Sequence, residues 1–125
     1  MESYLEKVRK FQDLRVWWEA HYLALSIYKE TKNYPRDERF GLTSQLRRAV
    51  VSIAANIAEG SKRRTTKDLC HFLSISEGSN EEVKCLLLLS RDLNYLANEE
   101  FDGLFQRCET IGAMVNGLLK SLQSP

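Results

Sequence analysis

The segment from Phe40 to Ser61 reads FGLTSQLRRAVVSIAANIAEGS and decides the fold of this 125-residue chain. A helical advance of about 100° per residue places its apolar and polar side chains in separate stripes. The apolar stripe consists of Leu42, Leu46, Ala49, Ile53 and Ile57, and the polar stripe consists of Gln45, Arg48, Ser52, Asn56 and Glu59. Because both repeat at intervals of three and four residues, the segment is predicted to be one helix.

A third side of the same helix carries Val51, Ala55 and Ala58, which are small and apolar. A surface helix of a monomer needs only one apolar stripe. We therefore expect this third side, together with the aromatic Trp17, to lie at an interface between subunits. The polar stripe is interpreted as a largely internal hydrogen-bonded network rather than an acid–base site, with Arg48 reaching a carboxylate.

Three further helices are predicted, over residues 13–32, 65–97 and 98–122. The first is indicated by the recurrence of Leu14, Trp18, Tyr22, Leu25 and Tyr28. Pro35 ends it, Gly60 is expected to be a left-handed terminal residue of the second helix, and Thr65 or Thr66 begins the third. Gly78 suggests that another backbone approaches the third helix closely. Short connections then give an all-α, up-down-up-down four-helix bundle as a single domain over 1–125.

The sequence also resembles a known family through FGL..QLRRA.VSI..NIAEGS, through IYKET at 27–31 and through GLLKSL at 117–122. These motifs are similar to those of the four-helix-bundle proteins encoded in intervening sequences of bacterial 23S ribosomal RNA genes, also called S23 ribosomal proteins. The resemblance implies a homo-oligomer, as a five-membered ring. It also implies relatedness to the accessory variability proteins of diversity-generating retroelements, which bind nucleic acid and a reverse transcriptase. The chain departs locally from the family at Ala54, where proline is common.

The net charge of +1 hides an asymmetry along the chain. Residues 36–67 carry eight basic and three acidic side chains, whereas residues 68–109 carry three basic and nine acidic ones. This asymmetry fits either complementary packing of helices or a basic surface for RNA. The candidate nucleic-acid contacts are Arg47, Lys62, Arg63, Arg64 and Lys67. A merely solvated basic turn at 62–67 is the alternative, and no base-reading motif is present.

The remaining features predict a cytoplasmic protein without a membrane span. The N-terminal MESYLEKVRK is charged, and the longest apolar run, Cys85–Leu89, has five residues. The three cysteines, at 70, 85 and 108, lack metal-type spacing and are expected to be buried thiols in a reducing compartment.

No motif for catalysis or cofactor binding is found in the sequence. Asp68, Cys70 and His71 are neighbours, but the Glu-x-x-His pairs of di-metal bundles are missing. We therefore expect no enzyme activity, metal, cofactor or small-molecule substrate. The sequence predicts a ring-forming protein that associates with structured RNA or another nucleic acid. The alternative is a protein-interaction adaptor, whose partner would be a nucleic-acid-binding protein such as a reverse transcriptase.

Overall fold

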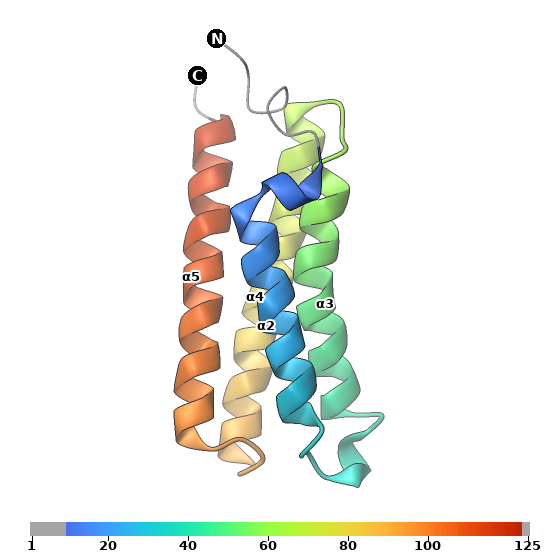
Figure 1. Ribbon diagram of the computed structural model, residues 1–125, viewed down its shortest axis with the longest axis vertical. Helices are drawn as coiled ribbons and strands as arrows, with labels where there is room; N and C mark the ends of the chain where they lie inside the picture. The colour runs from blue at the N-terminus through green and yellow to red at the C-terminus, as the bar shows by residue number, and fades with distance from the viewer. Residues whose placement is uncertain (1–9, 124–125) are drawn as a thin grey trace.

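The computed structural model describes residues 10–123, and four long helices account for most of them. These helices are α2 (Arg15–Thr31), α3 (Leu42–Gly60), α4 (Thr66–Asp92) and α5 (Asn98–Gln123); the short 3-10 helices are η1 (Phe11–Asp13) and η2 (Arg36–Glu38). Successive long helices run antiparallel (Figure 1). Residues 10–123 contain no strand, so the predicted four-helix bundle is confirmed. The charged N-terminal segment 1–9 lies outside the described residues.

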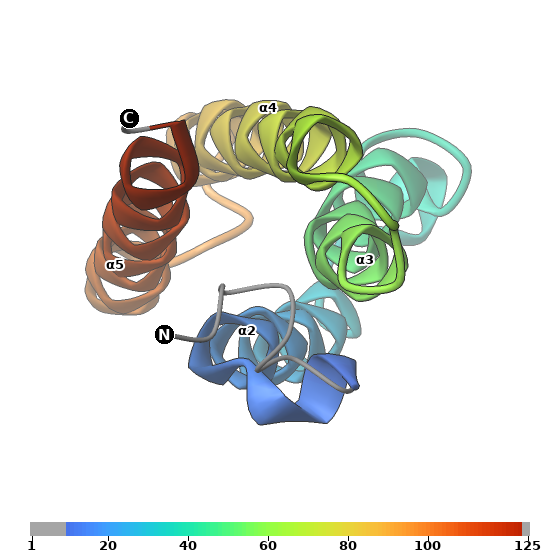
Figure 2. The same cartoon turned by 90° about the horizontal axis from the view of Figure 1, so that it is seen from above.

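Each long helix contacts two of the others. Helix α2 packs against α3 and α5, and α4 packs against the same two helices from the other side. Seen from above, α2 and α4 therefore lie at opposite corners of the bundle (Figure 2). This diagonal placement means that the outer faces of α2 and α4 point in different directions.

The core is built from one buried stripe on each helix. On α3, all five residues of the predicted apolar stripe are buried, together with Val50. The other helices contribute Leu23 and Ile27 from α2, Leu73, Val83 and Leu87 from α4, and Cys108, Ile111 and Val115 from α5. Full burial of such an aliphatic side chain contributes about 1.5–3 kcal/mol, so these stripes supply the main driving force for folding.

Helix α2 buries a different stripe from the one that predicts it. Val16, Ala20, Leu23, Ile27 and Thr31 face the core. Of the residues that reveal the helical period, only Leu14 is buried, whereas Trp18, Tyr22, Leu25 and Tyr28 are exposed. Both sides of α2 are apolar, and periodicity alone cannot say which of two apolar stripes meets the core. The exposed stripe is consequently an apolar surface.

The ends of α4 follow from local hydrogen bonding. The Thr65 hydroxyl accepts a bond of 3.1 Å from the backbone N–H of Asp68, which confirms the predicted threonine cap. At the other end, the helix stops at Asp92 rather than near Ala97. Asn94 has a left-handed backbone, with φ of 65°, and the Tyr95 N–H donates to the Ser90 carbonyl at 2.9 Å. Asparagine tolerates this conformation better than most residues, and here it ends the helix.

Two glycines have roles opposite to those expected. Gly60 does not have a positive φ; it is buried, and an added Cβ would lie 2.9 Å from the Cβ of Phe72 and 3.2 Å from Cδ1 of Leu69. Gly60 therefore allows α3 and α4 to approach each other closely. Gly78 is exposed, and apart from its own turn of α4 no atom of the described residues would lie within 4 Å of an added Cβ. The expected close backbone is thus absent within residues 10–123.

Alanine at these two glycines is expected to change stability in opposite directions. Gly60→Ala should lower the free energy of unfolding by about 1–3 kcal/mol, because the Cβ of Phe72 is bonded directly to the α4 backbone and can move only if the helix shifts. Gly78→Ala should raise it by about 0.5–1 kcal/mol, because alanine favours the helix and meets open space. Urea denaturation of both variants measures the difference. If Gly78→Ala instead lowers stability and reduces the oligomer mass, Gly78 contacts another subunit.

Candidate functional site

Five basic side chains gather where α2 ends and α3 begins. We call this set the basic corner: Lys32, Arg36, Arg39, Arg47 and Arg48. Two adjoining surface hollows, of about 410 Å³ and about 500 Å³, lie among them. Both hollows are lined by Arg39, Thr43 and Arg47, so they form one continuous cationic surface.

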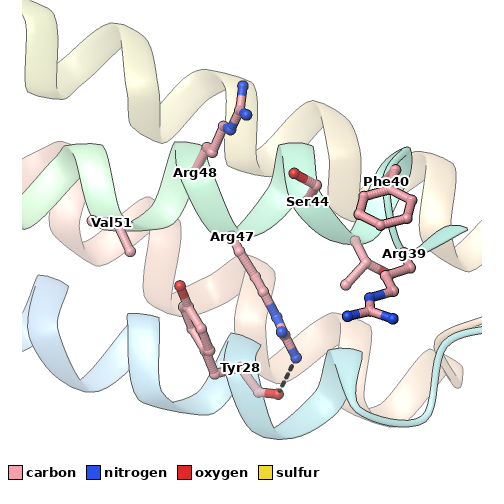
Figure 3. Close-up of a pocket in the computed structure, with 8 residues that line it drawn as sticks. Tyr28, Arg39, Phe40, Ser44, Arg47, Arg48 and Val51 are labelled. Atoms are coloured by element: carbon pink, nitrogen blue, oxygen red, sulfur yellow. Dashed lines mark hydrogen bonds between the residues drawn. The ribbon is translucent and has the colours of Figure 1, made fainter.

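Arg47 is held in place by the C-terminal turn of α2. Its Nε donates to the Thr31 hydroxyl oxygen at 2.9 Å, and its Nη2 donates to the Tyr28 carbonyl at 3.3 Å. The guanidinium also lies 4.6 Å from the centre of the Tyr28 ring. Figure 3 shows Arg47 reaching toward α2, while Arg48 points to the other side of α3. A positive charge near the C-terminus of α2 is favourable, because this is the negative end of the helix dipole. These contacts hold Arg47 in one position in the lining of the hollow.

The other four members of the basic corner are not engaged by a carboxylate. Within residues 10–123, no ion pair or side-chain hydrogen bond involves Lys32, Arg36, Arg39 or Arg48. All four are exposed. Clustered cations without carboxylate partners are the feature that phosphate recognition requires, because their charge is available to a ligand.

Two carboxylates, Asp37 and Glu38, lie in the connection beside the basic corner, and Glu38 is engaged elsewhere. Its Oε1 accepts from the Leu42 N–H at 3.1 Å and so caps the first turn of α3. Its Oε2 accepts from the Tyr95 hydroxyl at 3.0 Å, which raises the pKa of Tyr95. Glu38 thereby ties the α2–α3 connection to the α4–α5 connection, and it positions Arg39 at the start of α3.

Thr43 lies between the two hollows in the first turn of α3. Its side chain is only 8% exposed, and its hydroxyl has no hydrogen-bond partner in the described chain. Buried hydroxyls nearly always have a partner. The positive end of the α3 dipole and the adjacent Arg39 and Arg47 make this position favourable for an acceptor with negative charge.

The basic turn, Lys62, Arg63, Arg64 and Lys67, lies at the opposite end of α3 from Arg47. The structure therefore does not bring Arg47 together with these four predicted contacts. Arg63 is already engaged, since its Nη2 lies 2.8 Å from Glu59 Oε1 and its guanidinium lies 4.6 Å from the centre of the Phe72 ring. Arg64 and Lys67 are exposed. As a result, the turn offers less available charge than the basic corner.

The polar stripe of α3 is only partly connected. Ser52 Oγ lies 2.8 Å from Ser79 Oγ on α4, and Asn56 Nδ2 donates to the Ser52 carbonyl at 2.8 Å and to its hydroxyl at 2.9 Å. Gln45 donates weakly to Glu82 at 3.4 Å.

Arg48 is exposed and reaches no carboxylate of the described chain, and Glu59 is exposed in its pair with Arg63. Only Ser52 and Asn56 thus lie in the half-buried network.

The residues expected at a subunit interface differ in how far they are exposed. Val51 and Ala55 are exposed, and Ala58 is half-buried. Trp17 is half-buried rather than exposed, because it packs against the core and stacks on His21 with a ring separation of 4.8 Å. Its neighbour Trp18 is the exposed tryptophan.

The described residues contain no group of three or more His, Cys, Asp or Glu side chains arranged to hold a metal ion. Burial raises the pKa of the Cys108 thiol to about 12, so this thiol stays protonated at neutral pH. Cys70 is also buried, but Cys85 is exposed, contrary to expectation.

Among residues 10–123, no helix combines the length and the apolar character needed to cross a membrane.

Three members of the basic corner are not among the contacts predicted from the sequence: Lys32, Arg36 and Arg39. Two of them, Arg36 and Arg39, are in the connection PRDERF at 35–40, where Asp37 and Glu38 lie between them. Balanced charge in a connection does not by itself indicate a site. The structure is needed to recognise the cationic surface, because only there is Glu38 found to accept hydrogen bonds from the Leu42 N–H and the Tyr95 hydroxyl.

The fold and this surface define a small antiparallel four-helix-bundle protein with a cationic end. The family model described as 23S rRNA-intervening sequence protein matches residues 12–117. The chain belongs to this family, as the resemblance predicted. It is also similar in fold to a crystal structure of a protein of unknown function from the S23 ribosomal protein family of Bacteroides thetaiotaomicron. That similarity has a TM-score of 0.78 and 21% identity, over 84% of this chain and 95% of the other. No curated protein matches the sequence.

Proposed function

We propose that this protein is a non-enzymatic, ring-forming protein that binds the phosphate backbone of a nucleic acid through its basic corner. The observation that carries the proposal is the group of four exposed cations at one end of the bundle that form no ion pair within residues 10–123. Electrostatic attraction to phosphates is independent of base sequence and is strong when several cations act together. We therefore expect weak sequence selectivity.

A single copy of the basic corner is small, and the chain has a net charge of only +1. Assembly into a ring multiplies the number of cations that one nucleic acid meets. Linked sites raise the overall affinity well above that of one site, without any new kind of contact. The proposal therefore requires subunits that associate.

Two exposed apolar surfaces support association. The α2 patch consists of Trp18, Tyr22, Leu25 and Tyr28, and Val51 and Ala55 on α3 extend it. The α4 patch consists of Cys85, Leu88, Leu89 and Leu93. Large apolar side chains grouped on a surface are typical of protein contacts.

The positions of the two patches favour a head-to-tail contact. Helices α2 and α4 occupy opposite corners of the bundle (Figure 2). Leu25 and Leu89 each lie within about two turns of the end of their helix, and these ends are at the same end of the antiparallel bundle. A contact between two different patches generates a ring when the rotation closes. Resemblance to the family gives five subunits, and all basic corners would then lie on one face.

Salt-dependent binding of a fluorescent structured RNA tests the function. The test variant is Arg36→Gln, Arg39→Gln, Arg48→Gln, and its matched control is Lys62→Gln, Arg63→Gln, Arg64→Gln at the basic turn. We expect the parent protein to bind at low salt and to lose affinity steeply as salt rises. The corner variant should bind about a hundredfold more weakly, and the control should retain most of the affinity.

Other results would redirect the assignment. If the turn variant loses binding and the corner variant does not, the basic turn is the contact surface. If the parent protein binds no RNA even at low salt, the adaptor function is favoured instead. The α2 patch and the α4 patch would then be surfaces for a protein partner.

A further inference from the structure

Phe40 is the most exposed large apolar side chain of the described residues. The residue is 89% exposed, and it lies two positions before the first residue of α3. Because it contacts so little of the bundle, it contributes almost nothing to the hydrophobic stabilisation of the subunit. Its position beside the basic corner therefore calls for another explanation.

Arginines lie on both sides of Phe40. The guanidinium of Arg39 is 5.3 Å from the centre of the Phe40 ring. Phe40 borders the hollow of about 410 Å³ that also contains Arg39 and Arg47, and an adjoining hollow of about 300 Å³. Arg48 lines both hollows. Figure 3 shows Phe40 and Arg39 side by side at the start of α3, with Arg47 and Arg48 further along the helix.

An accessible aromatic ring flanked by cations matches the requirements of an unpaired nucleotide. Aromatic side chains stack on exposed bases, and neighbouring cations follow the phosphates. In a duplex the faces of the bases are already stacked on each other, so the ring would find no base to cover. Charge alone, in contrast, attracts duplex and single strand alike.

Building on the proposed function, we infer that the basic corner binds single-stranded nucleic acid, with Phe40 stacking on an unpaired base. Arg39 and Arg48 hold the phosphates on the two sides of that base. Stacking is tolerant of base identity, because every base has a flat face. The corner is thus selective for unpaired segments and not for a sequence. RNA and DNA single strands offer the same chemistry to these residues.

The experiment compares four fluorescent probes with the full chain at low salt: oligo(U), oligo(dT), and an RNA and a DNA duplex of the same length. Phe40→Leu keeps an apolar side chain but removes the aromatic ring, and Phe40→Tyr keeps the ring. We expect the parent protein to prefer the single strands. Phe40→Leu should weaken binding of the single strands by about fivefold or more and leave duplex binding unchanged. Phe40→Tyr should behave like the parent, and the RNA and DNA arms should agree.

Three results would overturn the inference. The first is equal affinity of the parent for single strands and duplexes. The second is a Phe40→Leu variant that binds every probe like the parent, while the variant with Arg36, Arg39 and Arg48 replaced loses binding; the proposed function would then stand without base stacking. The third is a reduced oligomer mass for Phe40→Leu, which would make Phe40 a subunit contact. If no probe binds even at low salt, the proposed function fails together with the inference.

Discussion

Leu25→Glu and Leu89→Glu are each expected to be monomeric in solution, and a mixture of the two is expected to contain a heterodimer. Leu25 belongs to the α2 patch and Leu89 to the α4 patch. A glutamate placed in either patch would be desolvated on assembly without a partner, which prevents the contact. In a head-to-tail ring, each variant retains one intact patch. One intact α2 patch can then meet one intact α4 patch across the mixture, and the association stops at two subunits.

Mass measurement on separated species checks this result. Ala113→Glu, at an exposed position of α5 outside both patches, is the matched control and should assemble like the parent. Val51→Glu should also weaken assembly, because Val51 adjoins the α2 patch. A dimer formed by either variant alone, with no heterodimer in the mixture, would show a contact of like patches. A parent protein that is a monomer at micromolar concentration would contradict the ring altogether.

Leu87→Ala is expected to lower the free energy of unfolding by about 2–5 kcal/mol, whereas Leu88→Ala should change it by less than about 0.5 kcal/mol. Leu87 is completely buried, while the side chain of Leu88 is 38% exposed. Removing the buried side chain leaves a cavity that the packed helices cannot fill. The midpoint of thermal unfolding should fall by about 10 °C or more for Leu87→Ala.

The pair should be compared in the Leu25→Glu background, so that loss of subunit contacts does not contribute to the measurement. Leu87→Met retains most of the volume and should cost less than about 1.5 kcal/mol. Equal destabilisation by Leu87→Ala and Leu88→Ala would mean that α4 is rotated about its axis relative to this structure.

This leucine run illustrates how far the sequence can predict the fold. Residues 85–89 read CLLLL, and a continuous apolar run contains no information about which side faces the core. The buried side of helix α3 could be predicted, because polar residues separate its apolar stripe from the rest of its surface. The buried side of helix α2 could not be predicted, because both of its sides are apolar. The helical period was recognised from the stripe that is exposed in the structure.

The candidate site depends on contacts between residues that are distant in sequence. Arg47 was grouped with the basic turn because both are basic residues on or next to the same predicted helix, yet α3 separates them along its length. Exposure of Phe40 could not be predicted either, since an aromatic residue before a helix often packs against that helix. The bond between Glu38 and Tyr95 spans 57 positions and has no signature in either segment.

That bond has a consequence for how the basic corner responds to a ligand. A free connection between two helices would lose conformational entropy when a ligand ordered it, and this loss would reduce the affinity. Glu38 anchors the connection on both sides before any ligand arrives. The arginine that follows it is therefore preorganised, and the tightness of this preorganisation is controlled by the loop between α4 and α5. Changes around Asn94 and Tyr95 can tune binding although they touch no cation of the basic corner.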